Sequence, residues 1–541
     1  MDGFVEASPA IKKMTLANTI DVTRSPSRIY KELIYLGKYT CLRKIPLMAR
    51  PSTICKPSIL KQISPNDWDE LKPHCGEYFW NRPSEEAVEI AEMKIDEVRP
   101  WPFLDDCRIA AQDVADEMLE VPLTAKEWTN EETLAHIDLT KGTSVPFRHY
   151  GFKTRKELVE SALWLQFYED IEWLKALGPI YESKGKEELA AIEDWFNKKV
   201  RTFQTTGFHL LYWQLRLFGQ GNENLKNFGW SKYGFNPFFG GTDKWYRELN
   251  IKDENGNVIY RIRICWDISG YDRKIFLKFV ALRRLRLWMQ ANPNSPYKKI
   301  AEWVAHGWIR SVLVFINGDV VIRVRGNNSG SGTTTTNNIE AGFEVCSDLL
   351  IFVYTTKYGV IPDKELVKKQ LIALFGDDNT MHLMDEFSFL TDQDLVKKRL
   401  LEQHGLVCKF LVGGVEHPYS ELPFLGFTFS PYKDFFIPKW NIQRILHPVL
   451  YTPCKKTSGQ YLQQVYSLMI LSFAHLPFFL KLRSVYIKLL QHYAGFGDPM
   501  TKAMVNLGVP TLEEVEAFYL GFESTLTDKI SLDMVTGGGG P

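Results

Sequence analysis

The chain has 541 residues, of which 45% are hydrophobic and 24% charged, and its 65 basic and 65 acidic residues cancel. This is the composition of an ordinary globular protein, long enough for two to four subdomains, and its net charge does not point to a nucleic-acid partner. Eight cysteines without a CxxC pair exclude an obvious zinc cluster or disulfide scaffold.

Charge is nevertheless clustered along the chain. The first sixty residues are rich in Lys and Arg, and residues 67–120 are acidic. An enclosed basic channel with acidic outer walls would fit this pattern, although a solvated basic arm fits the first segment as well. The apolar window 466–480 is interrupted by His475 and Pro477, so we expect a buried helix there and no membrane span.

Hydrophobic periodicity predicts the main elements in chain order. Residues 157–198 have a helical pattern, and 250–267 resemble a hairpin around Asn255-Gly256. After Asp272 the period becomes helical, with a predicted apolar face that includes Phe279 and Leu282. A second hairpin is predicted at 371–384, and Thr511 with Glu514 predicts a capped helix in a helical C-terminal region.

Two acidic groups far apart in the sequence stand where strands are predicted to end. Asp267 ends one strand, and Asp377-Asp378 lie in the turn of the hairpin at 371–384. Phosphoryl transfer to a nucleotide uses two divalent cations, and hard cations such as Mg²⁺ prefer carboxylate oxygens. These acids are therefore candidate metal ligands. Taken alone, Gly376-Asp377-Asp378 is also typical of an ordinary surface turn.

Asp272 follows Asp267 by five positions. In a strand that then turns, the two carboxylates can serve different ends of one pocket, with Asp267 on a metal and Asp272 accepting a hydrogen bond from a ribose hydroxyl. A strand-end acid followed by a helix N-cap would give the same spacing.

A glycine-rich segment, 326–338, leads into an apolar run that extends to Phe352. Glycines let a backbone approach a nucleic-acid strand closely, and the following helix would present Thr334 and Asn338 on one face. The alternative is a flexible Gly/Ser/Thr linker, but linkers seldom run directly into a strongly apolar segment.

Together these patterns resemble motifs A, B and C of viral RNA-dependent RNA polymerases of the picornavirus-like supergroup. The order is Asp-x4-Asp, then Ser-Gly-x3-Thr-x3-Asn in the register Ser329-Gly330, Thr334 and Asn338, then Gly-Asp-Asp. Residues 186–189 with 199–203 resemble motif F, 143–146 motif G, 405–409 motif D and 423–427 motif E. The Lys-Val-Arg-Thr-Phe run, the 230–245 segment and the Leu-Gly-Phe-Thr of motif E are most similar to astrovirus polymerases.

The resemblance implies an α+β right hand with an antiparallel palm sheet flanked by helices and a mostly helical thumb. The expected divisions are an N-terminal extension (1–140), fingers (141–255, returning at 291–328), a palm (256–290 and 329–435) and a thumb with a flexible Gly-rich tail (436–541). That tail also suggests a polyprotein junction.

The resemblance also implies roles for individual residues. Asp267, Asp377 and Asp378 would bind two Mg²⁺ or Mn²⁺ ions, and Lys409 would protonate the leaving pyrophosphate. The remaining site residues would bind the nucleotide (Lys186, Lys199, Arg201, Asp272, Ser329, Thr334 and Asn338) or the template (Thr143, Ser144 and Gly330).

The partners implied are an RNA template and nascent strand, ribonucleoside triphosphates, and other viral replication proteins or a protein primer, in replication complexes of the host cytoplasm. Two other readings stay open at this point. A reverse transcriptase shares the paired aspartates, but it usually carries a bulky aromatic residue where Asp272 stands and lacks the Asn338 partner. An inactive polymerase-like scaffold that binds RNA is disfavoured because all three metal-site carboxylates are present. Whether initiation is primed or de novo is not encoded in any pattern we recognise.

Overall fold

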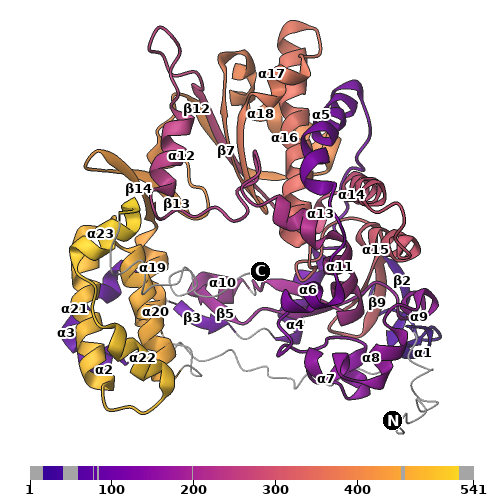
Figure 1. The fold of residues 1–541 in the computed structure, drawn as a ribbon, viewed down its shortest axis with the longest axis horizontal. Helices are drawn as coiled ribbons and strands as arrows, with labels where there is room; N and C mark the ends of the chain where they lie inside the picture. The colour runs from indigo at the N-terminus through magenta and orange to yellow at the C-terminus, as the bar shows by residue number, and fades with distance from the viewer. Residues whose placement is uncertain are drawn as a thin grey trace.

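The computed structural model describes residues 16–40, 59–76, 78–81, 84–197, 199–451 and 457–522. Within these ranges the strands form four sheets, and most strand pairs are antiparallel. Figure 1 shows three groups of elements arranged around the centre of the molecule: a four-stranded sheet with its helices, a six-stranded sheet with its helices, and the C-terminal helices. The expected α+β class is confirmed.

The four-stranded sheet is antiparallel throughout, in the order β10-β11-β7-β12. Its strands are β7 (Ile262–Ile268), β10 (Leu371–Phe375), β11 (Asp378–Leu383) and β12 (Cys408–Val415). Strand β7 is central and almost wholly buried, as its run of apolar residues predicts. The predicted hairpin at 371–384 is confirmed as β10 and β11.

Helices flank this sheet. Helix α16 (Thr334–Tyr358) is buried over most of its length and packs against β10 and against α5 (Asp106–Leu123). It ends at Gly359, whose positive φ of 73° forms a left-handed cap. Helices α17 (Lys364–Lys368) and α18 (Gln393–His404) lie beside it. A helix that is apolar on most sides must be enclosed by protein, so α16 is an internal support of the sheet.

The structure corrects two predictions around β7. The segment 250–267 is not a two-stranded hairpin: a single bridge joins Lys252 to Val258, and the partners of β7 come from β11 and β12. After α13 (Tyr271–Lys274), helix α14 (Lys278–Ala291) buries the predicted face only in part, because Leu285 and Met289 pack against the core but Leu282 is 48% exposed. Arg283 and Arg284 are buried instead, since carboxylates of α16 pair with both.

The six-stranded sheet has the order β1-β2-β9-β8-β4-β6, and only β4 and β8 pair in parallel among its described strands. Its strands are β1 (Ile20–Asp21), β2 (Ile34–Tyr39), β4 (Ile180–Gly185), β6 (Thr202–Thr206), β8 (Ser311–Val314) and β9 (Asp319–Arg323). The helical prediction for 157–198 is confirmed for α7 (Arg155–Val159), α8 (Ala162–Phe167), α9 (Ile171–Leu177) and α10 (Ile192–Phe196), and it is wrong between α9 and α10, where β4 and β5 (Glu188–Ala191) lie. Gly178, with a φ of 73°, ends α9, and the chain enters β4.

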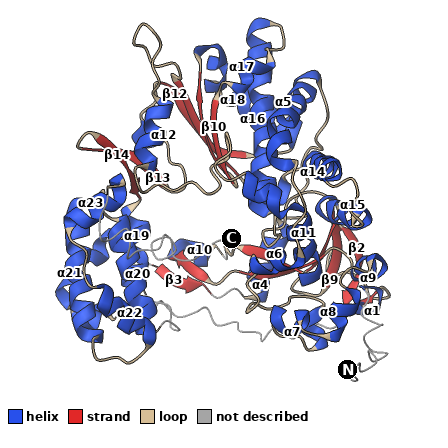
Figure 2. Ribbon diagram, in the orientation of Figure 1, coloured by secondary structure: helices blue, strands red, loops and turns tan. Residues whose placement is uncertain are grey.

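The C-terminal group is mostly helical (Figure 2). Its helices are α19 (Ile442–Leu450), α20 (Ser458–Leu471), α21 (Leu476–Tyr493), α22 (Pro499–Leu507) and α23 (Leu512–Leu520). The predicted capping box at Thr511 and Glu514 is confirmed. The buried helix predicted at 466–480 is two helices, because the chain turns between Leu471 and Leu476. The N–H groups of Phe239 and Gly240 donate to the carbonyls of Phe518 and Tyr519, which ties this group to the middle of the chain.

The N-terminal segment connects the groups. Helices α2 (Leu60–Ile63) and α3 (Pro65–Leu71) contribute Leu60, Trp68 and Leu71 to the core of the C-terminal helices. Strand β3 (Tyr78–Asn81) then pairs with β5 (Glu188–Ala191), and Figure 1 shows this pair between the C-terminal helices and the six-stranded sheet. Thus the N-terminal residues join regions that the sequence separates by more than a hundred residues.

The remaining elements complete the three groups. They are the hairpin of β13 (Phe427–Tyr432) and β14 (Phe435–Trp440) and the helices α1 (Leu16–Thr19), α4 (Glu85–Met93), α6 (Asn130–Ala135), α10 (Ile192–Phe196), α11 (Phe208–Asn224), α12 (Gly241–Leu249) and α15 (Lys298–Ile309). In the described ranges, every helix is too short or too polar to cross a membrane. The Gly-rich end and part of the basic N-terminal cluster lie outside the described residues.

Candidate active site

Strands β7 and β11 bring the predicted metal-site aspartates together. In their antiparallel register Met381 pairs with Ile264 and Leu383 with Ile262, and continuing that register places Asp378 opposite Asp267. The side chain of Asn379 secures this end of the ladder: its Oδ1 accepts from the Trp266 N–H at 3.2 Å, and its Nδ2 donates to the Trp266 carbonyl at 2.9 Å. The charge of Asp267 contributes to the raised pKa of Asp378, so the two carboxylates lie within electrostatic reach of each other.

Asp377 lies at the turn between β10 and β11, where Gly376 has a φ of 63°. Asp377 and Asp378 are both exposed. Desolvation by the surrounding protein is the main reason that the pKa of Asp378 is raised to about 6. The charges of Asp377 and Asp267 raise it further, and the charge of Arg444 opposes the shift. A carboxylate whose pKa is raised by neighbouring carboxylates is close enough to be repelled by them, so a cation between them would be stabilised.

The donor set suits a divalent cation with a strong preference for oxygen, such as Mg²⁺ or Mn²⁺. Across the described residues, no three His, Cys, Asp or Glu side chains already stand at metal-ligand spacing. Asp267, Asp377 and Asp378 therefore do not form a complete metal site by themselves, and their role as metal ligands stays a prediction.

Lys409 reaches this cluster through a β-bulge. Cys408 pairs with Ile268 and Phe410 with Asp267, so Lys409 is the extra residue of β12. Bulges re-aim side chains and are frequent beside active sites. Here the bulge accompanies a 2.9 Å ion pair between Lys409 Nζ and Asp267 Oδ2, with the lysine side chain 54% exposed.

Asp272 and Asn338 meet beside the acidic cluster. The Gly270 residue, with a φ of 61°, turns the chain from β7 into α13, which carries Asp272. The Asn338 Nδ2 donates to Asp272 Oδ1 at 2.5 Å, and the Tyr271 hydroxyl donates to the Asn338 carbonyl at 2.9 Å. Burial, and then the charge of Asp377, raise the pKa of Asp272. The structure therefore joins these two predicted residues directly.

Ser329 and Gly330, in the loop before α16, and Thr334, the first residue of α16, contact other partners. Ser329 Oγ accepts from the Gln204 N–H at 3.2 Å, so it points toward β6 and not toward the Asp272–Asn338 pair. The Gly330 carbonyl accepts from Thr206 Oγ1 at 2.6 Å, and a Cβ at Gly330 would lie 2.0 Å from the Gln204 carbonyl oxygen. Thr334 Oγ1 donates to the Asn328 carbonyl at 2.6 Å. This loop is therefore packed tightly on β6.

The three predicted phosphate-binding cations lie next to β5 and β6. Lys186 and Arg201 both approach Glu188, at 3.4 Å and 3.5 Å, and the Lys186 N–H donates to the Arg201 carbonyl. Lys199 pairs with Asp194 at 2.8 Å. The charge of Arg201 contributes to a lowered pKa of Arg273, next to Asp272, although burial of Arg273 is the larger cause. Arg201 thus lies within electrostatic reach of α13.

Thr143 and Ser144 are buried. Thr143 Oγ1 donates to the Phe152 carbonyl at 2.7 Å, and the hydroxyls of Ser144 and Thr205 are 2.9 Å apart. Both side chains are bonded within the protein, and their contact with a template stays a prediction.

Several residues that contact the site were not predicted from the sequence. Arg444, on α19, is exposed, and its Nη1 lies 3.2 Å from the position that a Cβ of Gly426 would take, next to the Asp378 turn. Asn379 directly follows Asp378 in sequence, and that adjacency was the available signal. Arg323 and Asn327 bind the segment of Asp272 from a distance of about fifty residues, which no local pattern indicates.

Comparisons with known proteins agree with this geometry. A family model described as viral RNA-dependent RNA polymerase matches residues 135–491. The non-structural polyprotein 1AB of Turkey astrovirus 2 is 22% identical over 161 residues, which are 29% of this chain and 10% of the polyprotein. That of Human astrovirus-4 is 29% identical over 147 residues, 27% of this chain and 10% of the polyprotein. The matched part of the chain thus spans about a tenth of these curated relatives.

Proposed function

Because this chain belongs to the family of viral RNA-dependent RNA polymerases, we propose that it synthesises RNA on an RNA template by two-metal nucleotidyl transfer. In this proposal it replicates and transcribes the genome of a positive-strand RNA virus. The observation that carries the proposal is the pairing of β7 with β11, which brings Asp378 within electrostatic reach of Asp267, with Asp377 in the adjoining turn.

We assign the parts of a right hand accordingly. The four-stranded sheet with α16 would be the palm, and the helices α19–α23 would be the thumb. The six-stranded sheet and its helices would be the fingers, with β3 and β5 bridging fingers to thumb. The sheet supports this assignment because Asp267 and Asp378 come from its strands, Asp377 lies in the turn between two of them, and α16 packs against β10.

Asp267 and Asp377 would hold both cations, with Asp378 assisting. When bound, the two ions would lower the pKa of the attacking 3′-hydroxyl and neutralise charge on the leaving pyrophosphate. The mutual repulsion of these carboxylates supports the assignment, since their ionised forms are the ones a cation would stabilise.

The protein's own cations would act on the triphosphate. Lys199 and Arg201, with Lys186, would neutralise it, and an arginine can engage phosphate in a bidentate way that lysine cannot. Lys409 donates to Asp267 at 2.9 Å. A triphosphate that engages the Asp267 site would provide a second acceptor, so Lys409 would be placed to transfer a proton to pyrophosphate.

Sugar selection would depend on Asp272 and Asn338, which the structure joins. A site that binds the 2′-hydroxyl leaves polar groups unpaired when a deoxynucleotide enters, and so it rejects that nucleotide. Ser329 would contribute only if its hydroxyl left Gln204, with which it is bonded. Template guidance by Thr143, Ser144 and Gly330 belongs to the same proposal.

The proposal is tested by incorporation of labelled UMP on a poly(A) template with an oligo(U) primer and Mg²⁺. We expect incorporation from UTP and far less from dTTP. Efficient incorporation from dTTP would indicate a reverse transcriptase, and RNA binding without incorporation would indicate an inactive scaffold.

The setting of this activity is also a proposal. The relatives are non-structural polyproteins of astroviruses, so we place this chain in replication complexes of the host cytoplasm. Its partners there would be the RNA template and nascent strand, ribonucleoside triphosphates and other viral replication proteins.

A further inference from the structure

The guanidinium of Arg323, at the end of β9, is buried beneath the turn that carries Asp272. Arg323 is 2% exposed. Its Nη2 donates to the Asp272 carbonyl at 2.6 Å, its Nη1 donates to Asn328 Oδ1 at 3.0 Å, and its Nε donates to the Arg325 carbonyl. A single side chain therefore connects α13 with the loop that precedes α16.

Gly326 lets this loop close over the guanidinium. Its φ is 92°, which favours glycine. A Cβ at this position would lie 1.6 Å from Arg323 Nη2 and 2.5 Å from the Arg273 carbonyl oxygen. Any other residue would have to displace either the arginine or the turn that holds Asp272.

The bonds continue from this loop to the pair proposed to read the ribose. The Asn327 N–H donates to the same Asp272 carbonyl at 2.6 Å, and the Asn327 Nδ2 donates to Asn338 Oδ1 at 2.9 Å. Since Asn338 Oδ1 accepts from Asn327, the amide NH₂ of Asn338 must face Asp272, where its Nδ2 donates at 2.5 Å. The hydrogen bond from Asn327 thus fixes the orientation of the Asn338 amide.

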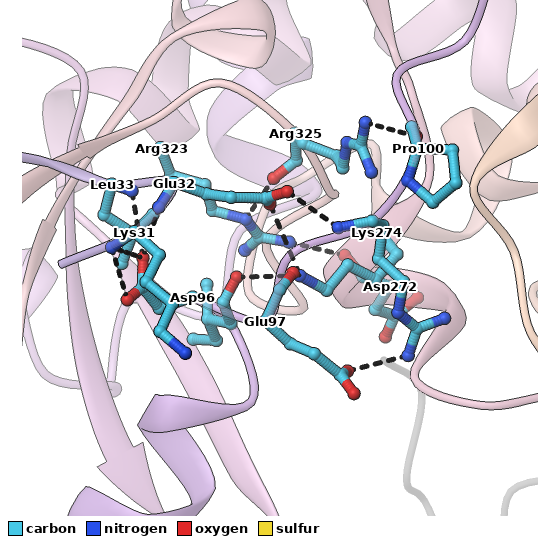
Figure 3. A network of polar contacts seen from close by, with 12 residues as sticks. Lys31, Glu32, Leu33, Asp96, Glu97, Pro100, Asp272, Lys274, Arg323 and Arg325 are labelled. Atoms are coloured by element: carbon cyan, nitrogen blue, oxygen red, sulfur yellow. Dashed lines mark hydrogen bonds and ion pairs between the residues drawn. The ribbon is translucent and has the colours of Figure 1, made fainter.

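A second layer anchors α13 from the N-terminal segment (Figure 3). Lys274 is buried, donates to the carbonyls of Ile95 and Glu97, and lies 3.6 Å from Glu32. Arg325 donates to the Pro100 carbonyl at 2.8 Å. The Asp272 turn therefore cannot shift without breaking several buried bonds, each costly to leave unmade.

We propose that Arg323 is a positioning residue for ribonucleotide selection. It holds the Asp272 backbone and the 326–328 loop together, so that Asn327 orients Asn338 toward the Asp272 carboxylate. This inference rests on the proposed function. Lysine cannot replace Arg323, because a single ammonium cannot span the carbonyls of Asp272 and Arg325 and the amide of Asn328 in one plane.

The test measures the ratio of kcat/KM for a ribonucleotide to that for its deoxy analogue in single-nucleotide extension. We expect R323K to lower this ratio about tenfold, since a misplaced Asn338 no longer leaves a polar group unpaired against the deoxy sugar. The matched control is R399K. Arg399 is also buried and bonded through all three guanidinium nitrogens, to Asp105 and Asp348, and R399K should leave the ratio within about twofold of wild type.

A double variant separates positioning from general stability. If Arg323 acts through Asn338, R323K with N338A should discriminate no worse than N338A alone, because coupled residues are not additive. The inference would be overturned if R323K kept the wild-type ratio of kcat/KM for the ribo- and deoxynucleotide while its Tm fell. It would also be overturned if the two substitutions lowered this ratio additively in the double variant. If R323K does not fold, N327A serves in its place, with a reduced ratio expected and an unchanged ratio contradicting the inference. If the wild-type protein incorporates no nucleotide, the proposed function itself is wrong. That result differs from a failure of the inference, in which the wild-type protein is active.

Discussion

The acidic turn of Asp377 and Asp378 lies within electrostatic reach of the Asp272–Asn338 pair, yet the two regions differ in exposure and bonding. Asp377 and Asp378 are exposed, and their charges repel. Asn338 is buried, and its amide bonds both Asn327 and Asp272. The carboxylates of Asp377 and Asp378 are accessible to a ligand, whereas the side chain of Asn338 is already hydrogen-bonded within the protein.

This difference in exposure suits two kinds of function. Carboxylates that bind a cation must be accessible, and the bound cation offsets the repulsion between them. Groups that discriminate between similar ligands must be held rigidly, because an adaptable partner would accept both. Substitutions in the first region should therefore change activity and spare stability, and those in the second should change selectivity and stability together.

The largest effect is expected for D377A. Removal of a metal ligand should lower primer extension at least about 10³-fold. The Tm should stay the same or rise, because Asp377 is exposed and its charge raises the pKa of Asp378 and Asp272. Extension assays and thermal unfolding measure the two quantities. D113A, at an exposed acid of α5, is the control and should leave extension near wild type. A large fall in Tm for D377A would show that the turn is structural.

A smaller effect is expected for K409Q. Loss of a positioned general acid should lower kcat by roughly 10²-fold. Stability should change by at most about 1 kcal/mol, because the ion pair with Asp267 is exposed. Single-turnover extension at saturating nucleotide measures kcat. A rise in KM with an unchanged kcat would instead assign Lys409 to binding.

Selectivity is the quantity that N338A should change. We expect ribonucleotide preference to fall roughly 30-fold, and the free energy of unfolding to fall by about 1–3 kcal/mol, since Asp272 and Asn327 each lose a partner. Extension with matched ribo- and deoxynucleotides gives the first value, and urea denaturation gives the second. An unchanged preference with reduced stability would limit Asn338 to a structural role.

The smallest effect is expected for R201A. Arg201 is 69% exposed and shares Glu188 with Lys186, so its loss should raise the KM for nucleotide only about fivefold while kcat holds. K175A removes another exposed, ion-paired cation from α9 (50% exposed) and should leave KM unchanged. Equal shifts in both variants would point to general charge and not to a nucleotide site.

How far the sequence predicts this molecule depends on how local each feature is. The hairpin at 371–384 was predictable because its turn and both strands lie within fourteen residues. The helical prediction for 157–198 was wrong between Leu177 and Ile192, because β4 is stabilised by β8, more than a hundred residues away, and β5 by β3. Leu282 was wrongly placed in the core because buried arginines on the same helix pair with α16.

The site shows the same limit. The resemblance to motifs A, B and C implied that Asp267, Asp272, Asp377, Asp378 and Asn338 belong to one site, and the structure brings them together. Spacing could not show that Ser329 faces Gln204 or that Arg323 supports Asp272, since both contacts join segments fifty or more residues apart.

The central claim is that acids from two strands form one cation-dependent centre. The most direct measurement is the single-turnover rate of incorporation of one ribonucleotide across a Mg²⁺ titration, for wild type, D267A and D377A. We predict a Mg²⁺-dependent rate for wild type and, for both variants, a rate at the level without metal. A variant that keeps a rate within about tenfold of wild type at saturating Mg²⁺ would contradict the claim.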